Sequence, residues 1–148
     1  MSVRFWLLGL CLCCAGFSQA GERIEFLNSG ELLPDNLPFS EAVRVGGTLY
    51  LSGQVGILPG TMKLVPGGVE PEALQTMKNI EAVLIANDYG LNNLVKCTVM
   101  LADIGDWPAF NGVYQAYLQK PYPARSAFAA AGLALGARVE VECMAAKS

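Results

Sequence analysis

The feature that most constrains the fold is the order in which two kinds of apolar periodicity follow one another along the chain. Apolar and polar residues alternate, or β-branched residues form short apolar runs, in five segments that predict strands: 42–45, 48–55, 94–101, 124–130 and 138–145. Apolar residues recur every three or four positions in two segments that predict helices: 71–89 and 107–120. The predicted order is therefore β-β-α-β-α-β-β.

This order predicts an α+β domain of two layers, in which both helices pack on one face of a mixed sheet. Gly46-Gly47 predicts a hairpin between the first two strands, and the glycine-rich residues 56–68 predict a loop. Residues 22–38 are expected to be irregular, because an Asn-Ser-Gly turn and two prolines interrupt them. The second face of the sheet is left uncovered, so we expect copies of the chain to associate through it.

Composition limits the chemistry that the chain can perform. It has 148 residues, 53% of them apolar and 16% charged, which predicts one packed domain and excludes a disordered chain. A net charge of −3 argues against binding driven by electrostatic attraction to nucleic acid or to an anionic membrane. The absence of histidine excludes Ser–His–Asp and Cys–His catalysis and most catalytic zinc sites.

The beginning of the chain has the organisation of a secretory signal peptide. Arg4 precedes an apolar run over residues 5–17, and Ser18-Gln19-Ala20 supplies small residues at positions −3 and −1 of a cleavage site. We therefore expect residues 1–20 to be removed, residues 21–148 to form a single domain, and the mature protein to be secreted or periplasmic.

The cysteines leave two questions open. Cys11, Cys13 and Cys14 follow Leu or Cys rather than the small residue of a lipoprotein site, so lipidation is the less favoured alternative to secretion. Cys97 and Cys143 remain in the mature chain, each within a strand-like apolar run. We expect both to be small buried side chains, with a disulfide between them as the alternative in an oxidising compartment.

Two charged residues in the last predicted strands are candidates for catalysis. Small residues surround Arg125, and the space that they leave suits bidentate binding of a carboxylate by the guanidinium. Glu140 lies on the polar face of an alternating strand. A hairpin centred between Gly132 and Leu133 would place Arg125 opposite Glu140 as a coupled pair. The alternative for each residue is an ordinary surface charge.

Two further places are candidates for binding. Ser52-Gly53-Gln54 interrupts an apolar strand, where a glycine marks either a bulge or the close approach of a ligand to the backbone. Asn111 falls on the second predicted helix beside Phe110, in the apolar stripe that includes Tyr114, where it either lines a site or faces solvent.

Together these residues resemble the Rid superfamily of reactive-intermediate imine deaminases. The resemblance covers residues 38–147 and rests on Leu51-Ser52-Gly53-Gln54, on Asn111 and Tyr114, on residues 121–126 (PYPARS) and on the ending VEVECMA. It implies a chorismate-mutase-like fold and a homotrimer with sites in the clefts between subunits. It also implies hydrolysis of 2-imino or enamino acids to 2-oxo acids and ammonia, without a metal or an organic cofactor.

The resemblance implies a role for each candidate residue. Arg125 would bind the substrate carboxylate, and Glu140 would orient or activate the attacking water. Ser52, Gly53 and Asn111 would line the substrate pocket.

Two positions depart from the family pattern. Phe39 occupies a substrate-binding position where active members carry a tyrosine, which predicts a shifted substrate or a slower enzyme. Ala127 replaces a frequent cysteine, and its backbone N–H would support the substrate carboxylate. A non-catalytic periplasmic protein that binds small carboxylates in the same cleft is the alternative function. A holdase or a ribonuclease is a further alternative, and the acidic charge and missing histidine disfavour the ribonuclease.

Overall fold

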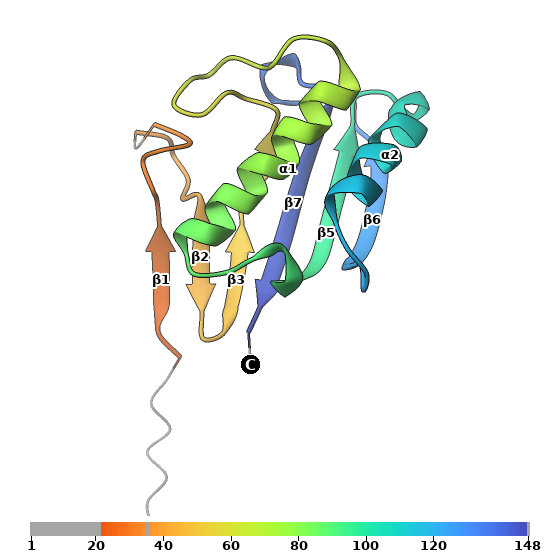
Figure 1. The fold of residues 1–148 in the computed structure, drawn as a ribbon. Helices are drawn as coiled ribbons and strands as arrows, with labels where there is room; N and C mark the ends of the chain where they lie inside the picture. Colours follow the sequence, from red (N-terminus) through yellow and green to blue (C-terminus); the bar gives the residue numbers. More distant parts are fainter. Residues whose placement is uncertain (1–21, 35, 148) are drawn as a thin grey trace, which may run out of the picture.

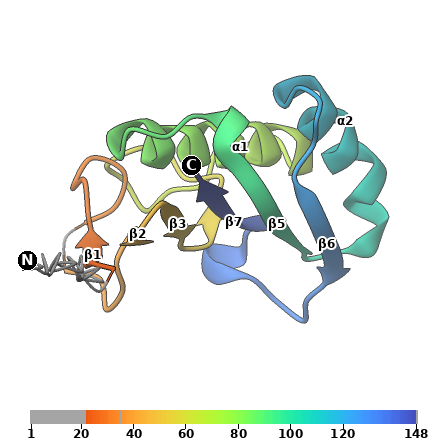
Figure 2. The same cartoon turned by 90° about the horizontal axis from the view of Figure 1, so that it is seen from below.

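A computed structural model describes residues 22–34 and 36–147, so the predicted signal peptide lies outside the described residues. The strands are β1 (Ile24–Leu27), β2 (Ala42–Val45), β3 (Thr48–Leu51), β4 (Gln54–Val55), β5 (Leu94–Leu101), β6 (Ala124–Ala129) and β7 (Val139–Ala146). Helices α1 (Val69–Ala86) and α2 (Trp107–Tyr117) pack on one face of the sheet, and Figures 1 and 2 show no second layer on the other face. The predicted α+β class with two layers is confirmed.

The sheet has one parallel pair among antiparallel ones. Its strands follow the order β1-β2-β3-β7-β5-β6, and β4 also pairs with β7. β5 and β6 are parallel, and α2 connects them because a parallel pair requires a crossover rather than a tight turn. The crossover leaves β6 at the edge of the sheet, while β7 pairs with the other side of β5.

The predicted hairpin between the strands of Arg125 and Glu140 is wrong. Arg125 pairs with Cys97 of β5, and Glu140 pairs with Met100 of β5 and with Val55 of β4. β5 therefore lies between the two strands. β7 has a fully apolar inward face, and its central position buries that face beneath α1, which an edge position beside β6 would not do.

Two other segments differ from the prediction. β1 lies within residues 22–38, and it forms through pairing with β2, a tertiary contact that a four-residue segment does not signal. The predicted strand over residues 48–55 is divided into β3 and β4 at Ser52-Gly53. The predicted hairpin with its turn at Gly46-Gly47 is confirmed.

Both predicted helices are confirmed, with ends that differ by less than one turn. Asp106 precedes α2, and Pro108 lies in its first turn, where proline is favoured because its missing N–H would have no partner. The Asp106 carboxylate makes no capping hydrogen bond, however. It accepts hydrogen bonds from Nε and Nη2 of Arg138, at 2.9 and 2.5 Å, and so ties the start of α2 to the start of β7.

The core lies between the sheet and the helices. Met77 and Leu84 of α1 and Phe110 of α2 are almost completely buried against the central strands. Cys97 and Cys143 face each other across β5 and β7 and form a disulfide, with Cα atoms 4.1 Å apart. The expectation that both cysteines are unpaired is therefore wrong. Directly opposed residues of an antiparallel pair approach this closely, and that register depends on the whole sheet.

The uncovered face of the sheet carries an apolar row. Phe26, Val43, Tyr50 and Met144 follow one another across β1, β2, β3 and β7. Phe26 is 73% exposed and Tyr50 is 44% exposed. A row of this kind favours association with another apolar surface, as the sequence predicts.

Candidate active site

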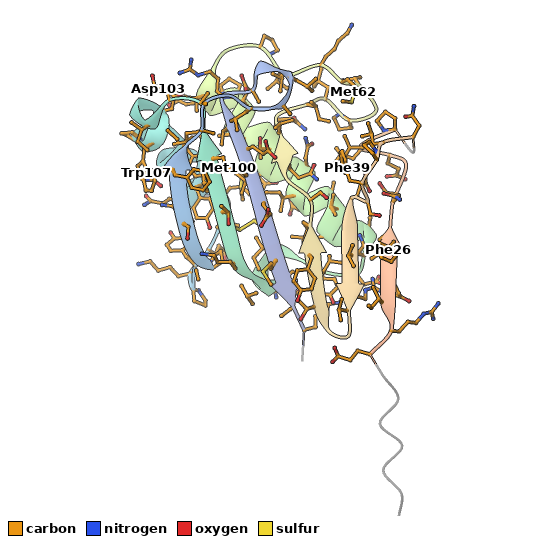
Figure 3. All side chains as sticks on the ribbon, turned by 180° about the vertical axis from the view of Figure 1, so that it is seen from behind. Phe26, Phe39, Met62, Met100, Asp103 and Trp107 are labelled. Atoms are coloured by element: carbon orange, nitrogen blue, oxygen red, sulfur yellow. A yellow bond between two sulfur atoms is a disulfide. The ribbon has the colours of Figure 1, made fainter. Side chains whose placement is uncertain are left out.

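A cavity of about 360 Å³ opens where β3 gives way to β4, and it contains one acidic side chain, Glu140. Phe39, Ser52 and Gly53 line the same cavity, so the structure brings together four of the residues that the sequence predicts for the site. In Figure 3, which views the uncovered face of the sheet, Phe39 lies toward the same end of the molecule as Met62, another residue of the cavity wall.

The Glu140 carboxylate lies directly against the backbone of Gly53. A Cβ placed on Gly53 would be only 2.1 Å from Oε1 and 3.0 Å from Cδ of Glu140. No side chain larger than hydrogen fits there unless Glu140 moves. The glycine inside the predicted strand therefore lies at a break between β3 and β4, where a carboxylate of the same chain approaches the backbone, which the sequence did not predict.

Ser52 holds the segment that carries Phe39. Its hydroxyl donates a hydrogen bond to the Ser40 carbonyl at 2.7 Å, and its N–H donates to the Glu41 carbonyl at 2.9 Å. These two bonds fix the chain on either side of Ser40 beside the cavity. Ser52 therefore positions Phe39, in addition to lining the cavity itself.

The environment of Glu140 favours its protonated form. Burial raises the pKa of the Glu140 carboxyl, and the neighbouring Glu142 carboxylate raises it further. A carboxylate with a raised pKa is a stronger base once it has lost its proton. Glu140 is thus suited to accept a proton from water at neutral pH.

Arg125 lies against α2, on a cradle of three aromatic rings. Its Cζ is 4.7 Å from the centroid of the Tyr114 ring, 5.3 Å from that of Trp107 and 5.9 Å from that of Phe110. Cation–π attraction to these rings holds the guanidinium in place without neutralising it. None of the ion pairs among residues 22–34 and 36–147 includes Arg125, so its hydrogen-bond donors are available to an anion.

Polar atoms without a partner lie on the α2 side of this arginine. Oδ1 of Asn111 and the hydroxyl of Tyr114 are buried and have no hydrogen-bond partner among the described residues. Burial raises the pKa of the Tyr114 hydroxyl, although the Arg125 charge acts to lower it. The hydroxyl therefore keeps its proton, and it can donate a hydrogen bond.

The backbone of β6 supplies a further donor. Ala130 donates its N–H to the Leu101 carbonyl of β5 at 2.8 Å. Alternate N–H groups of an edge strand point away from its partner, so the N–H of Ala127 points outward. Ala127 also lies on the same face of β6 as Arg125, two residues along the strand. An anion at the edge of β6 can thus contact both groups, as the resemblance implies.

The predicted residues form two separate groups within one chain. Phe39, Ser52, Gly53 and Glu140 line the cavity, whereas Arg125 and Ala127 lie on β6 and Asn111 lies on α2. Arg125 and Glu140 are registered with β5 residues three positions apart, so their side chains point to opposite faces of the sheet. Their Cα atoms are separated by about 10 Å across the strands and about 10 Å along them.

Some functional residues escape prediction from the sequence. Trp107 was not predicted, and Phe110 and Tyr114 were predicted only as an apolar stripe; their contact with Arg125 depends on how α2 docks on β6. Met62 and Leu135 line the cavity from two loops that no periodicity describes. The sequence signals the cradle only through aromatic residues that recur over about two turns of the second predicted helix.

The described residues contain no group of three acidic or cysteine side chains that could hold a metal ion. In the same part of the chain, no helix is both long and apolar enough to cross a membrane.

Comparison with known proteins identifies the family. Residues 33–147 match the family described as Endoribonuclease L-PSP. The chain belongs to this family. Its curated relatives include the 2-iminobutanoate/2-iminopropanoate deaminase of Mus musculus, which is 48% identical over 108 residues, or 73% of this chain and 80% of that protein. The Homo sapiens deaminase of the same name is 44% identical over 108 residues, or 73% of this chain and 79% of that protein.

Solved structures of the Endoribonuclease L-PSP family and its Rid relatives share the fold. RidA from the Antarctic bacterium Psychrobacter is 37% identical with a TM-score of 0.78, over 83% of this chain and 99% of that chain. TdcF from E. coli, solved with bound serine, is 26% identical with a TM-score of 0.78, over 84% of this chain and 99% of that chain. The predicted membership of the Rid superfamily is confirmed.

Proposed function

We propose that this protein is an imine deaminase that hydrolyses 2-imino acids to 2-oxo acids and ammonia. The observation that carries the proposal is the Arg125 guanidinium, which lies on three aromatic rings and has no acidic partner among the described residues. Such a group suits the carboxylate that every 2-imino acid carries. The relatives named 2-iminobutanoate/2-iminopropanoate deaminase, at 44% and 48% identity, support the same reaction.

The complete site forms between two copies of the chain. Arg125 and Glu140 point to opposite faces of one sheet, so a single small substrate cannot contact both within one chain. A neighbouring copy that covers the uncovered sheet face can bring its own Arg125 to the cavity of Glu140. The exposed apolar row of Phe26 and Tyr50 supports such a contact, and the resemblance favours a homotrimer with three sites.

Arg125 and the Ala127 N–H bind and orient the substrate in this site. The guanidinium forms two parallel hydrogen bonds with the carboxylate, and the outward N–H of Ala127 adds a third. Fixing the carboxylate sets the position of the adjacent imine carbon relative to Glu140. This orientation lowers the entropic part of the barrier to water attack.

Glu140 acts on the water that attacks the imine carbon. As the water oxygen bonds to carbon, its proton passes to the Glu140 carboxylate and the C=N π electrons move to nitrogen. Glu140 then gives this proton to the nitrogen, which leaves a tetrahedral amino alcohol. When the hydroxyl proton passes through Glu140 to the amine, the C=O bond forms, the C–N bond breaks and ammonia leaves.

The family is named for an endoribonuclease, but the residues of this chain favour the deaminase. The sequence has no histidine for general acid–base cleavage of RNA, and its net charge of −3 opposes binding to a polyanion. The alternative function is a periplasmic protein that binds small carboxylates without turnover. Such a protein would use Arg125 to bind the carboxylate, but it would not need Glu140 as a base. Turnover therefore separates it from the deaminase.

The protein functions after export through the signal peptide at residues 1–20. The Cys97–Cys143 disulfide supports this location, because disulfides persist in oxidising compartments and are rare in the cytosol of mesophiles. A buried cross-link between β5 and β7 gives a small exported domain additional stability.

The deaminase is tested by producing 2-iminobutanoate and 2-iminopropanoate in situ with an amino-acid oxidase, in the presence of semicarbazide as a competing trap. We expect the wild-type protein to suppress semicarbazone formation and to raise the rate of ammonia release. The variant Glu140→Gln should bind the 2-oxo acid product but should not suppress the trap. Product binding with no turnover by the wild-type protein would support the binding protein instead.

A further inference from the structure

We infer that the imino acids hydrolysed by this protein carry apolar side chains of the size of leucine or phenylalanine, larger than the methyl and ethyl groups of 2-iminopropanoate and 2-iminobutanoate. This inference rests on the proposed function and names the substrate class of the same site. It follows from the wall of the cavity beside Glu140.

The cavity wall is apolar everywhere except beside Glu140. Its large apolar side chains are Leu33, Leu37, Phe39, Ile57, Met62 and Leu135. The polar side chains in the wall are Ser52, Gln54 and Glu140, which lie on or beside β4 and the start of β7. Within this chain, a substrate whose reacting carbon lies at Glu140 therefore meets mainly apolar side chains in the rest of the cavity.

Three of the wall side chains are exposed to a degree that is unfavourable in water. Phe39 is 51% exposed, Leu135 is 50% exposed and Met62 is 45% exposed. These residues come from three separate segments of the chain and surround one cavity. Clustered apolar exposure of this kind indicates a surface that another apolar group covers. Phe39 makes this surface more apolar than a tyrosine would, because a tyrosine at that position would present a hydroxyl to the cavity.

The backbone of Leu135 has a strained conformation. Its φ of 59° and ψ of 11° lie in the left-handed region, which is strained for a residue with a bulky side chain. A glycine or an asparagine adopts this conformation more readily. A strained and half-exposed leucine at the rim of a cavity indicates that an apolar side chain is needed there.

The volume of the cavity selects the size of the substrate side chain. At about 360 Å³, the cavity is much larger than a methyl or ethyl group, although the imino acid group and the neighbouring copy's Arg125 share it. A methyl or ethyl side chain would leave most of this space to water in contact with apolar walls. An isobutyl or benzyl group would displace that water, which is the favourable term in apolar binding.

The test compares four imines that share the imino acid group and differ in side chain. An L-amino-acid oxidase produces them in situ from alanine, leucine, phenylalanine and glutamate, the last giving a polar side chain of a size similar to that of leucine. We expect kcat/KM to be at least about tenfold higher for the leucine and phenylalanine imines than for the alanine and glutamate imines. Affinities for the matching 2-oxo acids should follow the same order.

Two variants test the wall itself. Leu135→Asn keeps a residue that tolerates the positive φ, and Met62→Gln keeps the length of the side chain, while both remove apolar surface. Each should lower kcat/KM for the leucine imine about tenfold more than it lowers kcat/KM for the alanine imine. Leu74→Gln is the matched control, because Leu74 is 40% exposed on α1 and does not line the cavity.

The outcomes separate the two proposals. If the protein hydrolyses the alanine imine as fast as the leucine imine, the inference on substrate class is wrong and the deaminase proposal stands. If it hydrolyses no imine, the deaminase proposal is wrong. If Leu135→Asn changes the oligomeric state rather than the ratio of the two imines, Leu135 serves the contact between copies rather than substrate selection, and the inference is overturned.

Discussion

The Glu140 carboxylate occupies the space that a side chain on Gly53 would take. A Cβ on Gly53 would lie 2.1 Å from Oε1 of Glu140, although the two residues belong to segments far apart in the sequence. The break between β3 and β4 at Ser52-Gly53 thus gives the carboxylate a defined position at the cavity wall. The interrupted strand and the proposed catalytic base therefore form one structural unit.

Gly53→Ala should therefore reduce turnover without unfolding the protein. The added methyl group displaces the Glu140 carboxylate, and misplacement of a catalytic group by about 1 Å costs about 10²-fold in rate. Gly112→Ala is the matched control, because a Cβ on Gly112 in α2 meets nothing within 4 Å. Imine turnover and circular dichroism of both variants check this prediction. A Gly53→Ala protein with wild-type turnover would show that the position of Glu140 is not important for catalysis.

The pH dependence of kcat/KM should report the titration of Glu140. The base must be ionised, so activity is present above its pKa and is lost as the pH falls through it. Burial and the Glu142 carboxylate raise that pKa, so the activity should fall at a pH above the ordinary glutamic acid value of about 4.3. Glu142→Gln removes one of the two causes and should shift the midpoint to lower pH. A midpoint that does not move, or that moves upward, would contradict this assignment.

The Cys97–Cys143 disulfide should stabilise the protein. It closes a loop with a sequence separation of 46 residues, and its loss should cost about 2–4 kcal/mol of unfolding free energy. Urea unfolding of the Cys97→Ala/Cys143→Ala double variant measures this cost against the oxidised wild-type protein. In protein isolated from the periplasm, a thiol reagent should detect neither cysteine before reduction. Two reactive thiols in that material would mean that the bond does not form.

The fold could be predicted from the sequence where periodicity was strong. The helices, the β2–β3 hairpin and β5 were predicted because each has a regular apolar pattern or a glycine turn. The placement of β7 could not be predicted. Residue counting about a turn at Gly132-Leu133 pairs Arg125 with Glu140 in a hairpin, whereas β7 takes a central position because its apolar face is buried beneath α1. The same limit applies to the pairing of Cys97 with Cys143.

The site could be predicted only as individual residues. Local sequence singled out Arg125, Glu140 and Gly53, and the resemblance assigned their roles. Neither the aromatic cradle nor the wall residue Leu135 could be predicted, since each depends on the docking of a helix or a loop.

Arg125→Ala should weaken substrate binding while the protein remains folded. Loss of a bidentate, charge-assisted contact costs about 2–4 kcal/mol, which corresponds to about 30- to 1000-fold in kcat/KM. Arg125→Lys should restore only part of this loss, because an ammonium group lacks the planar fork. The melting temperature should change little, since none of the ion pairs among the described residues includes Arg125. Undiminished turnover in a folded Arg125→Ala protein would remove Arg125 from the site.

The central claim, that Arg125 of one copy acts with Glu140 of another, is tested most directly by mixing two inactive variants. Arg125→Ala and Glu140→Gln chains are co-expressed in equal amounts, and imine turnover is measured for the assembled protein and for each variant alone. In a closed ring with one site at each contact, about a quarter of the sites combine an intact Arg125 with an intact Glu140. The account predicts about a quarter of the wild-type specific activity for the mixture. A mixed assembly as inactive as either variant alone would contradict it, because the two residues would then have to act within one chain.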